Sequence, residues 1–127
     1  MEKYSLQIAG REIPLRYTMR ELADMEEAIG TMDNFRDLML KGSHRLRNMA
    51  AAIRIMGNSG LNKAGETADL TDDWLLDHMD PGKLKGYQIA VLGAVADGMR
   101  MESAEGDEDE EVDVVLEELK KKAEPTE

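Results

Sequence analysis

The stretch from Glu12 to Gly30, EIPLRYTMRELADMEEAIG, constrains the fold most, because it reads as a strand that runs directly into a capped helix. Thr18 and Glu21 have the spacing of a capping box, in which a hydroxyl and a carboxylate each satisfy a backbone N–H at the start of a helix. Gly30 stands where many helices end in a residue with positive φ. The sequence therefore predicts a helix between Thr18 and Gly30, entered from an extended segment.

Two short runs before Thr18 alternate between apolar and polar residues, as half-buried strands do. Their apolar positions are Tyr4, Leu6 and Ile8, then Ile13, Leu15 and Tyr17. We expect an antiparallel hairpin that pairs Ile8 with Ile13 across a four-residue loop at 9–12. A two-residue turn at 10–11 keeps the same register, but the longer loop turns Pro14, which lacks an N–H, away from the first strand. The apolar face of the hairpin is expected to pack on helices, since an isolated hairpin is marginal in water.

The remainder of the folded part is predicted to be helical. Apolar residues at helical spacing mark four further helices, at about 33–41, 43–56, 71–79 and 81–101, with Ser43 and Thr71 as N-caps. Residues 57–69 contain three glycines and little periodicity, which predicts a long loop. The fold class is therefore α+β, mostly α, with an N-terminal β-hairpin packed on four to five helices.

Charge divides the chain into two parts. Residues 102–127 hold 12 of the 27 acidic residues and 3 of the 16 basic ones, a net charge of −9, whereas residues 1–101 carry a net charge of −2. We predict one hairpin-plus-helical domain, residues 1–101, and an acidic tail, residues 102–127. Most of this tail is expected to be disordered because its like charges repel. Residues 112–119 have the spacing of a short amphipathic helix.

Two predicted helices and one aromatic residue supply candidate contacts with a partner protein. The 43–56 helix has an apolar stripe, and the 81–101 helix has small residues at every fourth position. Such a ridge lets another backbone approach closely, from the same chain or from a second copy. The single tryptophan is expected either to anchor the core or to contact a partner. The candidate contacts are Leu46, Met49 and Ile53 on the first helix, Gly86, Ala90, Ala94 and Gly98 on the second, and Trp74.

The most basic local region comprises Lys41, Arg45, Arg47 and Arg54. A solvated helix face is the ordinary interpretation of such a cluster. A groove for an acidic partner is the alternative.

The sequence lacks the motifs of common catalytic and metal sites. It has no cysteine, and its two histidines, His44 and His78, have no neighbours at metal-ligand spacing. No nucleophile elbow, phosphate loop or dinucleotide fingerprint is present. Residues 107–118 match part of a calcium loop by spacing, but Val112 stands where that loop requires glycine. We therefore predict no enzymatic activity, no cofactor and no metal site.

Location and partner class follow from the same composition. The first residues lack the apolar core of a signal peptide, and no run approaches the ~20 apolar residues of a membrane span. The acidic excess disfavours contact with phosphates, so no nucleic-acid partner and no membrane partner are expected. The prediction is a soluble, cytoplasmic protein.

The strand-to-helix junction also carries a family resemblance, which covers about a quarter of the chain. The residues that carry it are Leu15, Arg16, Tyr17, Thr18, Met19, Leu22, Met25, Glu26, Glu27 and Gly30. In these residues the chain resembles the tail assembly chaperones encoded by long-tailed bacteriophages, prophages and gene transfer agents.

The resemblance implies a binding function. Such chaperones bind the tape measure protein of a growing phage tail and shield its apolar helices until tube subunits polymerise around it. The tape measure protein is therefore the expected partner, the tail tube protein is a second candidate, and a homo-oligomer is expected because family members self-associate. The ten methionines suit an adaptable apolar surface, although core filling is their default role. The alternative is an acidic regulatory adaptor whose tail mimics nucleic acid toward a basic partner.

Overall fold

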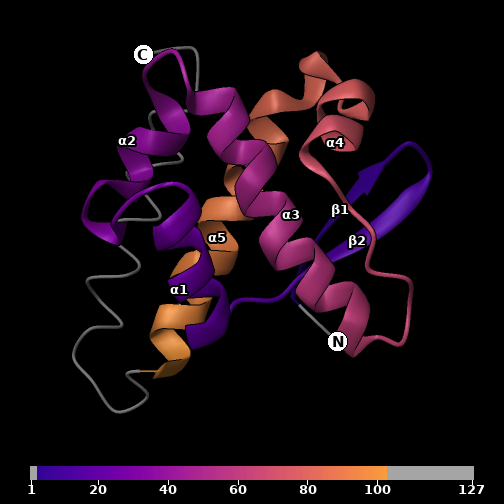
Figure 1. The fold of residues 1–127 in the computed structure, drawn as a ribbon, viewed down its shortest axis with the longest axis horizontal. Coiled ribbons are helices and arrows are strands. Elements are labelled where there is room, and N and C mark those ends of the chain that lie inside the picture. Colours follow the sequence, from indigo (N-terminus) through magenta and orange to yellow (C-terminus); the bar gives the residue numbers. More distant parts are fainter. Residues whose placement is uncertain (1–2, 103–127) are drawn as a thin grey trace.

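The computed structural model describes residues 3–102 of the chain. Within these residues a two-stranded antiparallel hairpin is followed by five α-helices, which is the mostly helical α+β fold that the sequence predicts (Figure 1). The elements are β1 (Tyr4–Ile8), β2 (Arg11–Leu15), α1 (Met19–Ala28), α2 (Phe35–Leu40), α3 (Arg45–Lys63), α4 (Asp72–His78) and α5 (Leu84–Glu102), with 3-10 turns η1 (Met32–Asn34) before α2 and η2 (Pro81–Lys83) before α5. The acidic tail beyond Glu102, with its predicted disorder and amphipathic segment, lies outside the described residues.

The hairpin turn is shorter than the sequence predicts. The predicted pairing of Ile8 with Ile13 is wrong by two residues, because Ile8 lies opposite Arg11. Only Ala9 and Gly10 connect the strands, and both have positive φ, 54° and 77°. Two consecutive residues with positive φ form the turn whose twist matches that of the flanking strands. A shift of two residues keeps every side chain on its face, so the predicted buried face is correct.

Pro14 fits this register without loss of a strand-to-strand hydrogen bond. It lies opposite Ser5, three pairs from the pair that flanks the turn. Antiparallel pairs alternate between those that exchange hydrogen bonds and those that do not, and the pair next to a two-residue turn exchanges them. The Ser5–Pro14 pair is therefore of the kind that needs no N–H from Pro14.

Helix α3 is the element on which the others pack: it contacts β2, α1, α2, α4 and α5. It begins at Arg45 with His44 as N-cap, so the predicted cap at Ser43 is wrong by one residue. Its inner face forms the middle of the hydrophobic core, together with the buried face of the hairpin and the middle of α5. The fully buried residues of α3 include Ala50, Ala52, Ile53 and Met56.

The C-terminal part of α3 runs through residues 57–63, which the sequence predicts to be loop. The glycines there are contact positions for β2. A Cβ on Gly60 would lie 2.7 Å from the carbonyl carbon of Pro14 and closer still to its oxygen, and one on Gly57 would lie 2.7 Å from Ile13 Cγ2. Beyond the strand, the Arg16 N–H donates to the Met56 carbonyl at 3.1 Å. The two glycines therefore let the strand cross the helix at close range.

Helix α1 starts with the predicted capping box. The Thr18 N–H donates to Glu21 Oε1 at 2.6 Å, and the Thr18 hydroxyl bonds the same carboxylate. Glu21 is only 4% exposed, whereas Asp24 and Glu27 of the same helix are exposed. Burial raises the pKa of Glu21, but hydrogen bonds from Ser59 of α3 and from Thr18 outweigh it, so the pKa lies below its usual value of 4.5.

This lowered pKa predicts a pH dependence of stability. The contribution of ionised Glu21 is fully present above the unfolded-state pKa and is lost as the pH falls through the lower folded-state pKa. Glu21→Gln should therefore lower the free energy of unfolding near neutral pH and flatten its decline on acidification, measured by urea unfolding between about pH 6 and pH 3. Glu27→Gln, exposed on the same helix, is the matched control. Parallel acid profiles for the wild type and E21Q would contradict this assignment.

Candidate partner-binding surfaces

The structure separates the three candidate contacts on α3. Leu46, in the first turn of the helix, is 46% exposed, whereas Met49 and Ile53 are 1% and 0% exposed. Met49 and Ile53 belong to the hydrophobic core of this chain, because the apolar stripe of α3 faces the hairpin and the other helices. In this conformation only Leu46 is available to a partner.

The small-residue ridge of α5 is mostly covered by the chain itself. Ala90 and Ala94 are buried, and a Cβ on Gly98 would overlap the ring of Tyr17. Gly86 is open, since a Cβ there would meet no atom within 4 Å. The group that approaches Gly98 therefore belongs to the same chain. It is an aromatic side chain, whereas the spacing predicts a second backbone.

A further glycine of α5, absent from the predicted ridge, has a similar role. A Cβ on Gly93 would lie 2.7 Å from the ring of Tyr4 in β1. The absence of a side chain at Gly93 and Gly98 thus leaves space for the rings of Tyr4 and Tyr17, respectively. Sequence spacing does not reveal Gly93, because it lies off the four-residue repeat.

Trp74 lies at the edge of the core, half-buried and packed against the core cluster. Its ring stacks on His78 with centroids 4.5 Å apart, and the Arg11 guanidinium lies 5.9 Å from the ring centroid. Arg11 also pairs with Asp69 at 2.8 Å and donates to the Thr67 carbonyl at 2.6 Å. Trp74 therefore helps to join α4 to the hairpin, which favours the anchoring alternative.

Most of the described methionines fill the core, including Met25, Met39 and Met56, which are 0% exposed. The large apolar side chains that are exposed in the described part of the chain are Met19, Leu46 and Met99. Met19 opens α1 and Met99 lies near the end of α5. The contact of Tyr17 with Gly98 makes the start of α1 a neighbour of the last turns of α5.

A groove of about 620 Å³ lies between α1, α3 and the segment that leads to α4. It is lined by Arg16, Arg20, Glu21, Asp24, Arg54, Ile55, Asn58, Ser59, Asn62 and Ala68. The sequence groups Arg54 with Arg45 and Arg47, but the structure places it in this groove with Arg16 and Arg20. No sequence pattern predicts this grouping, because it arises only when α1 packs on α3.

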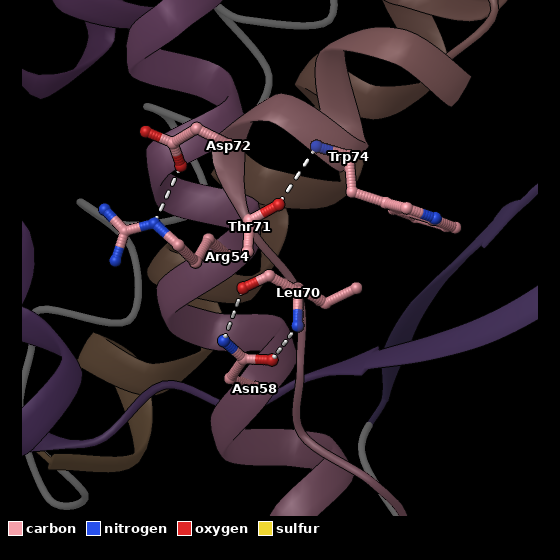
Figure 2. A network of polar contacts seen from close by, with 6 residues as sticks. All are labelled: Arg54, Asn58, Leu70, Thr71, Asp72 and Trp74. Atoms are coloured by element: carbon pink, nitrogen blue, oxygen red, sulfur yellow. Dashed lines mark hydrogen bonds and ion pairs between the residues drawn. The ribbon is translucent and has the colours of Figure 1, made fainter.

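Polar contacts fix one wall of the groove (Figure 2). The Asn58 side chain bonds both backbone groups of Leu70: Nδ2 donates to the carbonyl at 3.1 Å, and Oδ1 accepts from the N–H at 2.9 Å. Arg54 Nε donates to Asp72 Oδ1 at 2.7 Å. The Thr71 hydroxyl accepts from the Trp74 N–H at 3.0 Å, which confirms the predicted cap of α4. These bonds hold the start of α4 against α3.

Comparisons of the chain with protein-family models, curated proteins and solved structures found no match. Within residues 3–102, no three His, Cys, Asp or Glu side chains are grouped as a metal ion requires. Among the helices described, none has the length and apolar character needed to cross a membrane.

Asn58→Ala is expected to lower the free energy of unfolding by about 1–3 kcal/mol, because both backbone groups of the buried Leu70 lose their partners. Amide hydrogen exchange at Leu70 should accelerate in the same variant. Asn62→Ala, one turn further along α3 and exposed, is the control and should change stability little. Urea unfolding of the two variants measures the difference, and equal stabilities would show that the Asn58 clamp has no energetic role.

Proposed function

We propose that the protein is a bacteriophage tail assembly chaperone, which binds the tape measure protein and keeps it soluble until the tail tube polymerises around it. The proposal rests on the resemblance carried by residues 15–30. What supports it is that this stretch forms one continuous junction: β2 leads through Thr18 into α1, and Gly30, with φ 155°, follows the end of that helix.

The exposed apolar side chains favour a partner with apolar helices. Met19, which belongs to the resembling residues, is 60% exposed, and Met99, which follows Gly98 in α5, is 44% exposed. Methionine side chains are flexible and polarisable, so they suit surfaces that grip varied apolar segments. Leu46 offers a second apolar contact at the start of α3. An amphipathic helix of a tape measure protein presents the complementary surface.

The proposal predicts that a tape measure protein is encoded beside this gene, and co-expression with a fragment of that protein tests it. We expect a larger soluble fraction of the fragment, measured after centrifugation, when the wild-type chain is present. Met19→Asp should reduce this gain, because it places a charge in the apolar contact while aspartate remains acceptable in the first turn of a helix. Thr31→Asp, at an exposed polar position, is the matched control and should keep the gain.

The same assay separates the acidic-adaptor alternative. In a full-length variant, every acidic residue from 105 to 111 is replaced by its amide. The chaperone proposal expects this variant to keep the fragment soluble. If the amide variant fails while Met19→Asp succeeds, the acidic tail is the active part and the chaperone proposal is contradicted. An equally insoluble fragment with and without the wild-type chain would also contradict it.

A further inference from the structure

We propose that the groove between α1 and α3 binds an acidic polypeptide segment, and that its occupant is the acidic run of the same chain, residues 105–113. The inference is independent of the proposed function. It rests on the charges that line the groove, on the position at which α5 ends, and on the composition of the run that follows.

Three guanidinium groups line the groove, and two of them have capacity for a further anion. Arg20 is 82% exposed, and its 3.7 Å pair with Asp24 is a solvent-exposed contact of little strength. Arg54 holds Asp72 through Nε, and its two terminal nitrogens point away from that carboxylate (Figure 2). Arg16 donates through Nη1 to Ser59 at 3.3 Å, which fixes its side chain at the wall of the groove.

The carboxylates of the groove offset these charges only in part. Glu21 is buried and directed toward Thr18 and Ser59, so hydrogen bonds from the chain already hold its charge. Asp24 is half-exposed beside Arg20. Asn62 and Ser59 add polar groups, and Ile55 adds an apolar surface. An extended segment rich in carboxylates matches this lining, because guanidinium groups bind carboxylates through paired N–H donors.

The run from 105 to 113, EGDEDEEVD, has seven acidic residues and no basic one. It follows α5, which ends at Glu102, one turn beyond Gly98. Gly98 lies against Tyr17, the residue next to Arg16, and Figure 1 shows the last turns of α5 beside α1. The end of α5 therefore lies beside α1, one of the helices that line the groove. An extended residue adds about 3.3 Å of reach, so the eleven residues from 103 to 113 have a maximum reach of about 36 Å.

Tethering makes this run the favoured occupant among acidic segments. A segment linked to its site by a short connection has an effective concentration in the millimolar range, far above that of most free partners. Contact with the arginines also relieves the mutual repulsion of the seven acidic side chains. Binding of this kind is expected to weaken as added salt screens the charges.

Paramagnetic relaxation in the full-length protein tests the inference, and the absence of cysteine allows a single spin label. The label is attached at Ala68→Cys, on the exposed rim of the groove, and at Lys85→Cys near the start of α5 as a control position. We expect the amide signals of residues 105–113 to broaden severalfold more with the label at position 68. Raised salt should remove the difference. Equal broadening from both positions would overturn the proposal.

Charge reversal in the labelled protein tests the arginine contact. Arg20→Glu should abolish the broadening from position 68, and Arg20→Gln should reduce it. Lys83→Glu makes the same change in net charge outside the groove and should leave the broadening intact. Unchanged amide signals from residues 3–102 show that each variant is folded. If R20E and K83E act alike, the groove is not the site.

A mixed sample identifies the source of the bound segment. Protein of natural isotope abundance that carries the spin label is mixed with isotope-enriched protein that carries no spin label. If broadening occurs only when the spin label and the isotopes are in the same chain, the contact is intrachain. Equal broadening in the mixed sample would show that the segment comes from a second copy, and would overturn the proposal as stated.

Discussion

Replacing Gly60 with alanine is expected to lower the free energy of unfolding by about 2–3 kcal/mol, although alanine is the better helix former. The added Cβ would overlap the Pro14 carbonyl oxygen and lie 2.7 Å from its carbon. These are backbone atoms in the β2 strand, which is bound to β1 on one side and packed on α3 on the other. Relief of the overlap therefore requires that the strand and the helix separate.

Gly86→Ala is the matched control for this prediction. Gly86 lies in α5, is exposed, and has open space where its Cβ would stand. Alanine there should raise the free energy of unfolding by about 0.5–1 kcal/mol through helix propensity alone. Urea unfolding followed by far-ultraviolet circular dichroism measures both variants. A Gly60→Ala protein as stable as Gly86→Ala would contradict the close crossing of β2 over α3.

Ile53→Ala should cost about 3–4 kcal/mol, because it removes a fully buried side chain from the centre of the core. Leu46→Ala, two turns earlier on the same helix, should change stability by less than about 0.5 kcal/mol, because Leu46 is 46% exposed. The two substitutions remove apolar side chains of the same size from one predicted stripe. Their unfolding free energies separate the core position from the surface position.

This contrast also affects how binding data are read. Loss of partner binding in Ile53→Ala would reflect unfolding, so it carries no information on the contact surface. Loss of binding in Leu46→Ala, with stability unchanged, would place Leu46 in the contact. Equal destabilisation by the two variants would show that the start of α3 is covered in solution.

Features set by neighbouring residues were predictable from the sequence. The capping box of Thr18 and Glu21 fixes the start of α1, and the Thr71 cap fixes the start of α4. Pro81 opens the last helical segment through a 3-10 turn. In each case the signal and the structure lie within one helical turn. The buried face of the hairpin was predictable for the same reason, because alternation along a strand is independent of its partner.

Features set by contacts between distant segments were not predictable. Ala9 adopts a positive φ that its side chain disfavours, so the sequence does not indicate a two-residue turn there. Gly57 and Gly60 read as loop residues because their partners, Ile13 and Pro14, are far away in the chain. Charged Glu21 is buried where α1 packs on α3, and its partner Ser59 lies on that other helix.

The candidate surfaces follow the same division. Helical spacing identified an apolar stripe on α3, but it does not tell which positions are covered. Met49 is covered by neighbouring elements and Leu46 is not. This difference depends on how far the elements packed on α3 extend along it. The groove with Arg16, Arg20 and Arg54 depends on the packing of α1 against α3 and has no local signal at all.

If the protein is the proposed chaperone, its folded body binds the partner by covering apolar surface. Calorimetric titration of the full-length chain with an apolar helical segment of the tape measure protein, at several temperatures and two salt concentrations, measures whether this is so. We expect a negative heat-capacity change and an affinity that changes little with salt, since apolar burial drives the proposed contact. A heat-capacity change near zero, with an affinity that falls steeply as salt is added, would contradict it.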